Sequence, residues 1–112
     1  LGRDVLAKLD ANLDEQSEAV ERADVIGYVE LDRQFHACIV SGLDNEEYAE
    51  VMSRLQDKFV LTVRTTFNRS KLRMQGSLAE HRAIRAALEG DDPAVTERLM
   101  AKHIEYVKQV ML

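Results

Sequence analysis

Hydrophobic residues recur along most of this chain every three or four positions, which is the spacing of one face of an α-helix. The first stretch carries such an apolar stripe, with acidic and basic residues between its members: Val5, Leu6, Leu9, Leu13 and Val20. Asp24 is of the residue type that caps a helix, and Gly42 is of the type that ends one. The positions between them predict a second helix, whose inward residues are Val25, Val29, Phe35, His36 and Ile39.

A third helix is predicted after Asn45, which can cap it, with Glu46 and Glu47 in the first turn, where acids suit the helix dipole. Its apolar stripe consists of Tyr48, Val51, Met52, Leu55, Phe59 and Val63. Positions 60–66 are rich in β-branched residues and form the one strand-like patch. The length of the apolar pattern and its helical flanks favour a helix there.

The remaining third of the chain predicts two more helices. Residues 68–76 are the least regular and are expected to carry a bend, and a helix follows from about Ser77 to Leu88, with Gly90 just past its end. Asp92 and Pro93 are a typical helix start. The last helix is expected to turn five residues inward: Val95, Leu99, His103, Val107 and Val110.

The pattern therefore predicts an all-α fold, an antiparallel bundle of about five to six helices. With 112 residues, 46% of them hydrophobic and 31% charged, residues 1–112 are expected to form one domain with a core of its own. Few aromatic residues and a single proline favour helices over a β-sandwich. A net charge of −5 argues against direct binding to nucleic acid.

Cys38 is the single cysteine, so the chain cannot form an internal disulfide and fits a reducing compartment. No apolar run approaches membrane-spanning length and no signal peptide is recognisable, so a cytoplasmic location without membrane contact is expected. Because the sequence begins at Leu1 and not at methionine, we expect a fragment whose partner domain is missing.

The candidate chemistry lies in three histidines, all on predicted inward faces: His36, His81 and His103. Asp32 precedes His36 by one helical turn, so both side chains lie on one face and can bind one ion. Two more imidazoles from other helices would complete a mixed nitrogen and oxygen site of the kind that binds a divalent transition metal. Two plainer interpretations stay open: hydrogen-bonded core histidines, and an ordinary ion pair between Asp32 and His36.

The segment Asp32–His36 resembles the D-x-x-F-H signature of the FCD domain, the C-terminal effector-binding module of the FadR subfamily of GntR-type bacterial transcription regulators. The segment Glu80–Ile84 is similar to the E-H-x-x-I motif of that family. His103 and Asn45 also fall where the family has a histidine and an asparagine. The similarity runs from about Leu13 to the C-terminus and includes a further matching set: Ala87, Gly90 and Asp91.

The resemblance implies a helical effector-sensing and dimerising domain, here without the N-terminal winged helix-turn-helix domain that usually binds DNA. The first helix of the family domain is also expected to be missing. A homodimer and a small organic acid as effector follow from the same resemblance. In metal-binding members an aspartate and three histidines hold a divalent ion, and here they correspond to Asp32, His36, His81 and His103.

Zinc is the first choice for the ion, with nickel or manganese as alternatives, because all three accept imidazole and carboxylate ligands. Arg64 is the expected cation for a bound carboxylate, since it lies in an apolar segment and resembles a family arginine. Thr65 and Ser77 are possible hydroxyl donors, and Ser77 lies one turn before His81. The alternatives are that Arg64 reaches solvent and that Ser77 only caps a helix.

No catalytic set is recognisable, so the chain is predicted not to be an enzyme. Glu80 points about 100° away from His81 on a helix, and Cys38 has no visible partner base. The prediction is a metal-containing sensor of a small carboxylate that modulates DNA binding by an attached domain. Two rivals stay open: a metal-dependent helical hydrolase or oxygenase, and a metal-free structural dimerisation module.

Overall fold

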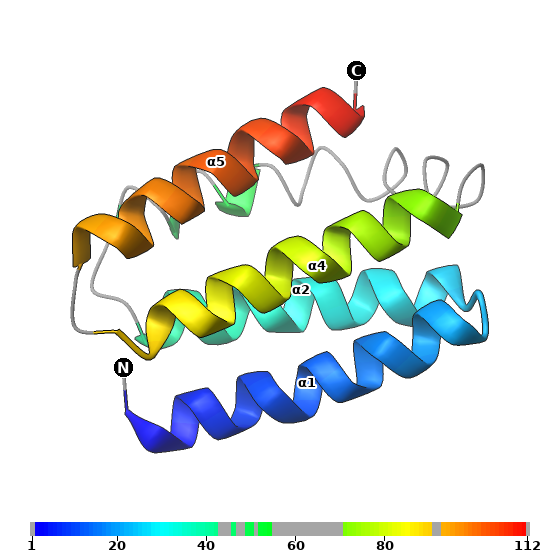
Figure 1. Cartoon of the computed structure of the whole chain (residues 1–112), viewed down its shortest axis with the longest axis horizontal. Coiled ribbons are helices and arrows are strands. Elements are labelled where there is room, and N and C mark those ends of the chain that lie inside the picture. Colours follow the sequence, from blue (N-terminus) through cyan, green and yellow to red (C-terminus); the bar gives the residue numbers. More distant parts are fainter. Residues whose placement is uncertain are drawn as a thin grey trace.

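The computed structural model describes residues 2–42, 46, 49–50, 52–54, 71–90 and 93–111. Four helices have defined bounds: α1 (Arg3–Glu21), α2 (Val25–Gly42), α4 (Lys71–Leu88) and α5 (Pro93–Met111). Residues 46, 49–50 and 52–54 are helical as well, and the described ranges contain no strand. α1 runs antiparallel to both α2 and α4, and α5 runs antiparallel to α4 (Figure 1). The predicted all-α bundle is therefore confirmed.

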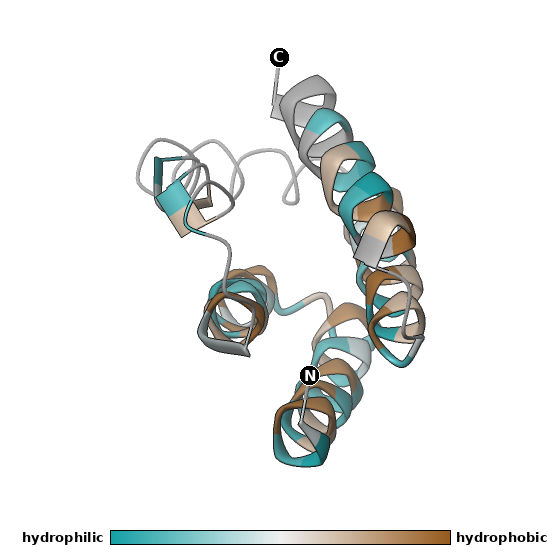
Figure 2. Cartoon of the chain, turned by 90° about the vertical axis from the view of Figure 1, so that its left-hand side faces the viewer, coloured by the Kyte–Doolittle hydropathy of each residue, from teal (hydrophilic) through white to brown (hydrophobic). Residues whose placement is uncertain are grey.

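α1 and α4 each contact two neighbours in the described bundle. α1 packs against α2 and α4, and α5 packs on α4. Figure 2 shows the helices nearly end-on, each with apolar and polar residues on different sides. The buried apolar residues come from every described helix, because each one turns its stripe toward the same interior: Leu9, Leu13, Ala19, Val20, Tyr28, Val29, Phe35, Ile39, Met52, Met74, Leu78, Ile84, Leu88 and Met100.

The predicted start of the second helix is confirmed at Asp24. Its Oδ1 accepts a hydrogen bond from the backbone N–H of Gly27 at 3.0 Å, which satisfies a donor that the first helical turn leaves unpaired. A Cβ on Gly27 would collide with the Asp24 carboxylate, so glycine leaves room for the cap. Ala23, with φ of 53°, makes the left-handed turn that ends α1. The connection is short, and α1 and α2 therefore become antiparallel neighbours.

Two details of the sequence prediction are wrong. α4 begins at Lys71, so positions 71–76, expected to be irregular, are helical. Good helix formers precede Gly76, and the buried Met74 adds a core contact that outweighs the cost of the glycine. Val95 was expected to face inward but is 36% exposed. It precedes the buried Met100 by five residues, which places it about 140° around the helix.

No described helix combines the length and the apolar character that crossing a bilayer requires.

Candidate metal centre

Three helices bring a carboxylate and three imidazoles to one point of the interior. α2 contributes Asp32 and His36 from successive turns, α4 contributes His81, and α5 contributes His103. The three histidines are 2%, 0% and 1% exposed, in that order, although imidazole is a polar group. Each pair of their ring centroids is 5.1 Å apart. The Asp32 side chain keeps 22% exposure, so the cluster has one edge toward solvent.

The polar atoms of this cluster are within the reach of one ion. Oδ1 of Asp32 lies 3.3 Å from Nε2 of His36 and 3.0 Å from Nε2 of His81. Nε2 of His103 lies 3.3 Å from Nε2 of His36, and all three histidines offer ligand atoms within 4.8 Å of one another. Ligands that bind one zinc ion tetrahedrally are about 3.3 Å apart. The spacing therefore suits a divalent transition metal, whose identity the donor set leaves open.

Aromatic rings form the wall behind His81. The ring of Phe35 is stacked on it, with centroids 4.5 Å apart and planes 26° apart. Tyr28 lies nearly parallel to the same imidazole at 6.4 Å between centroids. These rings keep water away from the imidazole and restrict its tilt, so little reorganisation is needed when a metal ion binds at its Nε2 atom.

A polar pair on α1 completes the surroundings of His81. Nδ1 of His81 lies 2.8 Å from Oε1 of Gln16, which is fully buried. Nε2 of Gln16 donates to Oδ1 of Asn12 at 2.6 Å, and Nδ2 of Asn12 donates to the carbonyl of Leu31 at 3.0 Å. The sequence analysis did not predict these two residues. One signal was present, because Gln16 falls on the inward stripe of α1, between Leu13 and Val20.

Burial and the neighbouring charges act against each other within the cluster. Burial raises the pKa of Asp32, but the hydrogen bonds and charges of His36 and His81 outweigh it and hold that pKa well below its usual value. Burial lowers the pKa of His81, although Asp32 opposes the shift. Burial and the charges of His81 and His36 lower the pKa of His103 to about 2. An ionised carboxylate therefore lies beside two imidazoles, those of His81 and His103, that resist protonation.

Nε2 of His81 is a buried atom that a cation would satisfy. Nε2 of His81 has no hydrogen-bond partner within the described part of the chain, although it lies 3.0 Å from Oδ1 of Asp32. When His81 is neutral with its lone pair on Nε2, two lone pairs face each other at this distance and repel. A proton between them would satisfy this one contact, whereas an ion would also bind the nearby nitrogens of His36 and His103. The residues present fit a divalent metal.

The three predicted effector contacts have different outcomes. Ser77 is buried inside α4, where its Oγ accepts a hydrogen bond from the hydroxyl of Tyr28 at 2.7 Å. It lies seven positions into α4, so it is not the cap of that helix. Arg64 and Thr65 lie outside the described residues. Among the rejected catalytic candidates, Glu80 and Cys38 are both partly exposed.

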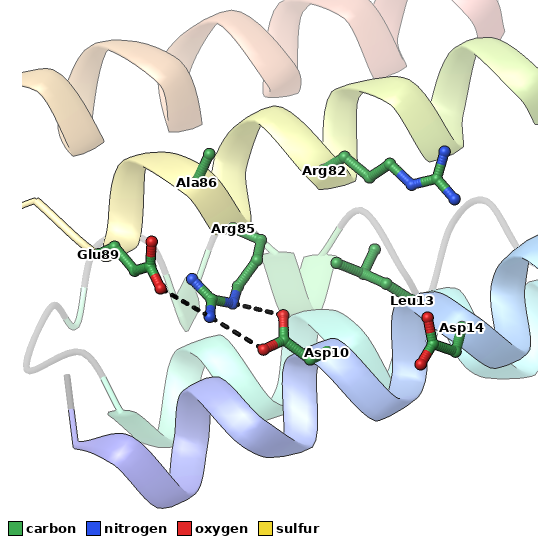
Figure 3. Close-up of a pocket in the computed structure, with 7 residues that line it drawn as sticks. All are labelled: Asp10, Leu13, Asp14, Arg82, Arg85, Ala86 and Glu89. Atoms are coloured by element: carbon green, nitrogen blue, oxygen red, sulfur yellow. Dashed lines mark hydrogen bonds and ion pairs between the residues drawn. The ribbon is translucent and has the colours of Figure 1, made fainter.

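A second polar constellation lies on the outside, in an open groove of about 410 Å³ between α1 and α4 (Figure 3). Nε and Nη2 of Arg85 donate to the two carboxylate oxygens of Asp10 at 2.8 and 3.0 Å. Nη2 also contacts Glu89 at 3.2 Å. We call Asp10, Arg85 and Glu89 the Arg85 clasp. Because its charged groups already bind one another, the clasp is a link between two helices and offers no evident effector site.

The fold and the buried donor set define an all-helical domain built around an interior metal-type cluster. The profile of the FCD domain matches residues 1–106, and the chain belongs to this family. The match begins at residue 1, earlier than the Leu13 start expected from the motifs. FCD domains are effector-sensing domains of GntR-type transcription regulators, in which another domain binds DNA. Comparison with curated proteins and with solved structures gives no match.

Proposed function

We propose that this chain is a metal-containing sensor of a small organic acid, with Asp32, His36, His81 and His103 as the metal ligands. The observation that carries the proposal is the meeting of one carboxylate and three buried imidazoles from three helices at 3.0 to 3.3 Å. Zinc is the first choice of ion, and nickel or manganese would accept the same ligands. Family membership supports the sensing role.

The chemistry of the site favours a carboxylate as effector. A divalent ion supplies positive charge and, at a coordination number above four, open positions for carboxylate oxygens. Asp32 keeps an exposed edge, so the cluster has a side on which a small anion can approach. Arg64 and Thr65 are proposed as further contacts. Ser77, one helical turn before His81, is proposed as a hydroxyl donor.

The proposed signal is a shift between helix packings, not a chemical reaction. Asp32 and His36 fix α2, His81 fixes α4 and His103 fixes α5 relative to one centre. A ligand that binds one packing more tightly than another changes the populations of the two. In a homodimer this change would alter the spacing of the attached DNA-binding domains. The domain senses its effector and does not turn it over.

Metal analysis of the purified protein, followed by a thermal-shift screen of small carboxylates with and without chelator, tests this proposal. We expect about one divalent ion per chain. Chelator should lower Tm, and a bound carboxylate should raise Tm only in the metal-loaded protein. A protein without stoichiometric metal and with a Tm insensitive to chelator would instead be a structural module. A compound consumed during incubation would identify an enzyme.

Arg64→Ala tests the proposed effector contact. Loss of the guanidinium should weaken carboxylate binding by roughly tenfold or more, because a charge-assisted hydrogen bond is lost. Metal content should stay unchanged. The measurement is calorimetric titration of the metal-loaded protein with the best carboxylate from the screen. Equal affinity of the variant and the parent would remove Arg64 from the site.

A further inference from the structure

We infer that Gln16, held by Asn12, is a positioning residue that fixes the tautomer of His81 and aims its Nε2 lone pair at the metal position. This inference rests on the proposed metal site and assigns a role to α1, which carries none of the four proposed ligands. Gln16 is fully buried, and its Oε1 lies 2.8 Å from Nδ1 of His81. Its function depends on which of its two amide ends faces the ring.

The direction of the hydrogen bonds follows from one group that can only accept. The backbone carbonyl of Leu31 has no proton, so the Asn12 atom 3.0 Å away must be the amide nitrogen, Nδ2. The other end of that amide, Oδ1, then faces Gln16 at 2.6 Å and requires a donor there, which is Nε2 of Gln16. Oε1 of Gln16 is left to face His81. Every amide orientation is thus set by the peptide group of Leu31.

The direction of these hydrogen bonds determines which ring nitrogen of His81 carries the proton. An amide oxygen can only accept, so Nδ1 of His81 must carry the hydrogen. The neutral ring then has its lone pair on Nε2, the atom that lies 3.0 Å from Oδ1 of Asp32. The opposite tautomer would place two acceptors against each other at Gln16, in a fully buried position. The relay of Leu31, Asn12 and Gln16 therefore prepares His81 for a metal ion at Nε2.

The primary experiment compares zinc affinities by competition with a chromophoric chelator. Gln16→Met keeps the length of the side chain and removes the acceptor, and we expect zinc affinity to fall about 10- to 100-fold. Gln16→Glu restores an acceptor oxygen and should keep affinity closer to that of the parent. Arg85→Gln is the matched control, because it removes hydrogen bonds between the same two helices, α1 and α4, and leaves Gln16 in place. Its zinc affinity should be unchanged.

Nitrogen NMR of the histidine rings in the parent protein gives a second test that needs no variant. We expect His81 to show a proton on Nδ1 and zinc on Nε2 in the loaded protein. A proton on Nε2 of His81, or zinc on Nδ1, would overturn the inference. Unchanged affinity in Gln16→Met would overturn it as well, as would an equal loss in Arg85→Gln. If the parent binds no zinc at all, the proposed function fails, and a proton on Nδ1 of metal-free His81 would still support the relay.

Discussion

The Arg85 clasp and the buried histidine cluster are both polar links between helices, but they differ in exposure to solvent and therefore in energetics. The clasp joins α4 to α1 with short, two-pronged hydrogen bonds, and Asp10 in it is 56% exposed. The hydrogen bond to Asp10 raises the pKa of Arg85, so its guanidinium is charged at any ordinary pH. Water and salt can replace its partners, which limits its contribution to stability.

In the histidine cluster, water and salt cannot replace the partners in this way. Its imidazoles are at most 2% exposed, so a polar atom that lacks a partner there keeps the full cost of desolvation. The role of polar residues between helices therefore depends on how deeply they are buried. The exterior link is complete in itself, whereas the interior cluster leaves Nε2 of His81 without a hydrogen-bond partner within the described residues. Burial, and not the number of charges, therefore distinguishes the candidate metal centre from the surface ion pair.

The largest effect is expected when the interior cluster loses a ligand. His81→Ala removes a nitrogen and opens a cavity beside Asp32, and stoichiometric metal should be lost. At saturating metal the stability lost with the ion is expected to be several kcal/mol, since binding of metal to the folded state adds to its stability. Metal content by mass spectrometry and Tm with and without chelator are the measurements. Full metal occupancy in the variant would remove His81 from the ligand set.

The second-largest effect on stability is expected when the pH is lowered, and it should come from the histidine cluster. The pKa of His103 is about 2 in the folded state, and that of His81 is also lowered, against a value of 6.5 in the unfolded chain. Above pH 6.5 the two rings are neutral in both the folded and the unfolded chain, so they cause no pH dependence of stability there. Below it the unfolded chain binds more protons, and stability falls by about 1 to 3 kcal/mol over the next one to two pH units.

Urea unfolding of the chelator-treated protein at a series of pH values measures this effect. A free energy of unfolding that stays flat from neutral pH down to about pH 5 would contradict the buried neutral state of these histidines. Arg85→Gln should leave the slope of that profile unchanged, because the guanidinium that it removes carries its charge throughout this range. That variant is the matched control for the acid experiment.

The smallest effect is expected at the clasp itself. Arg85→Gln should cost roughly 0.5 to 1 kcal/mol at low salt, because the pair with Asp10 is exposed on one side. The cost should shrink as salt is raised, and metal content should not change. Urea unfolding at low and high ionic strength measures it. A cost of several kcal/mol, independent of salt, would mean that the clasp behaves as an interior group.

Sequence reasoning predicted what periodicity and local chemistry can encode. The i, i+4 spacing of Asp32 and His36 placed them on one face, and the apolar neighbours of His81 and His103 indicated that both rings face inward. Asp24 was recognised as a cap because its type and position are local signals. The start of α4 was missed, since Gly76 is a strong local breaker and the burial of Met74 is a tertiary effect.

The relay was missed for a different physical reason. Gln16 and Asn12 are ordinary polar residues of a helix until α2 and α4 are placed beside α1. Their role depends on the carbonyl of Leu31 and the ring of His81, which are 19 and 65 positions away from their respective partners. A polar residue on an apolar stripe raises the question of a buried partner, but the sequence does not name that partner.

The polar contacts around His81 form a closed path. It leaves α2 at the carbonyl of Leu31, passes through Asn12 and Gln16 on α1 and His81 on α4, and returns to α2 at Asp32, the next residue. A tilt of α2 moves both ends of this path together. A slide of α1 by the rise of one residue, about 1.5 Å, would break its first and last amide contacts at once. The path therefore fixes the axial register of α1 relative to α2 and α4.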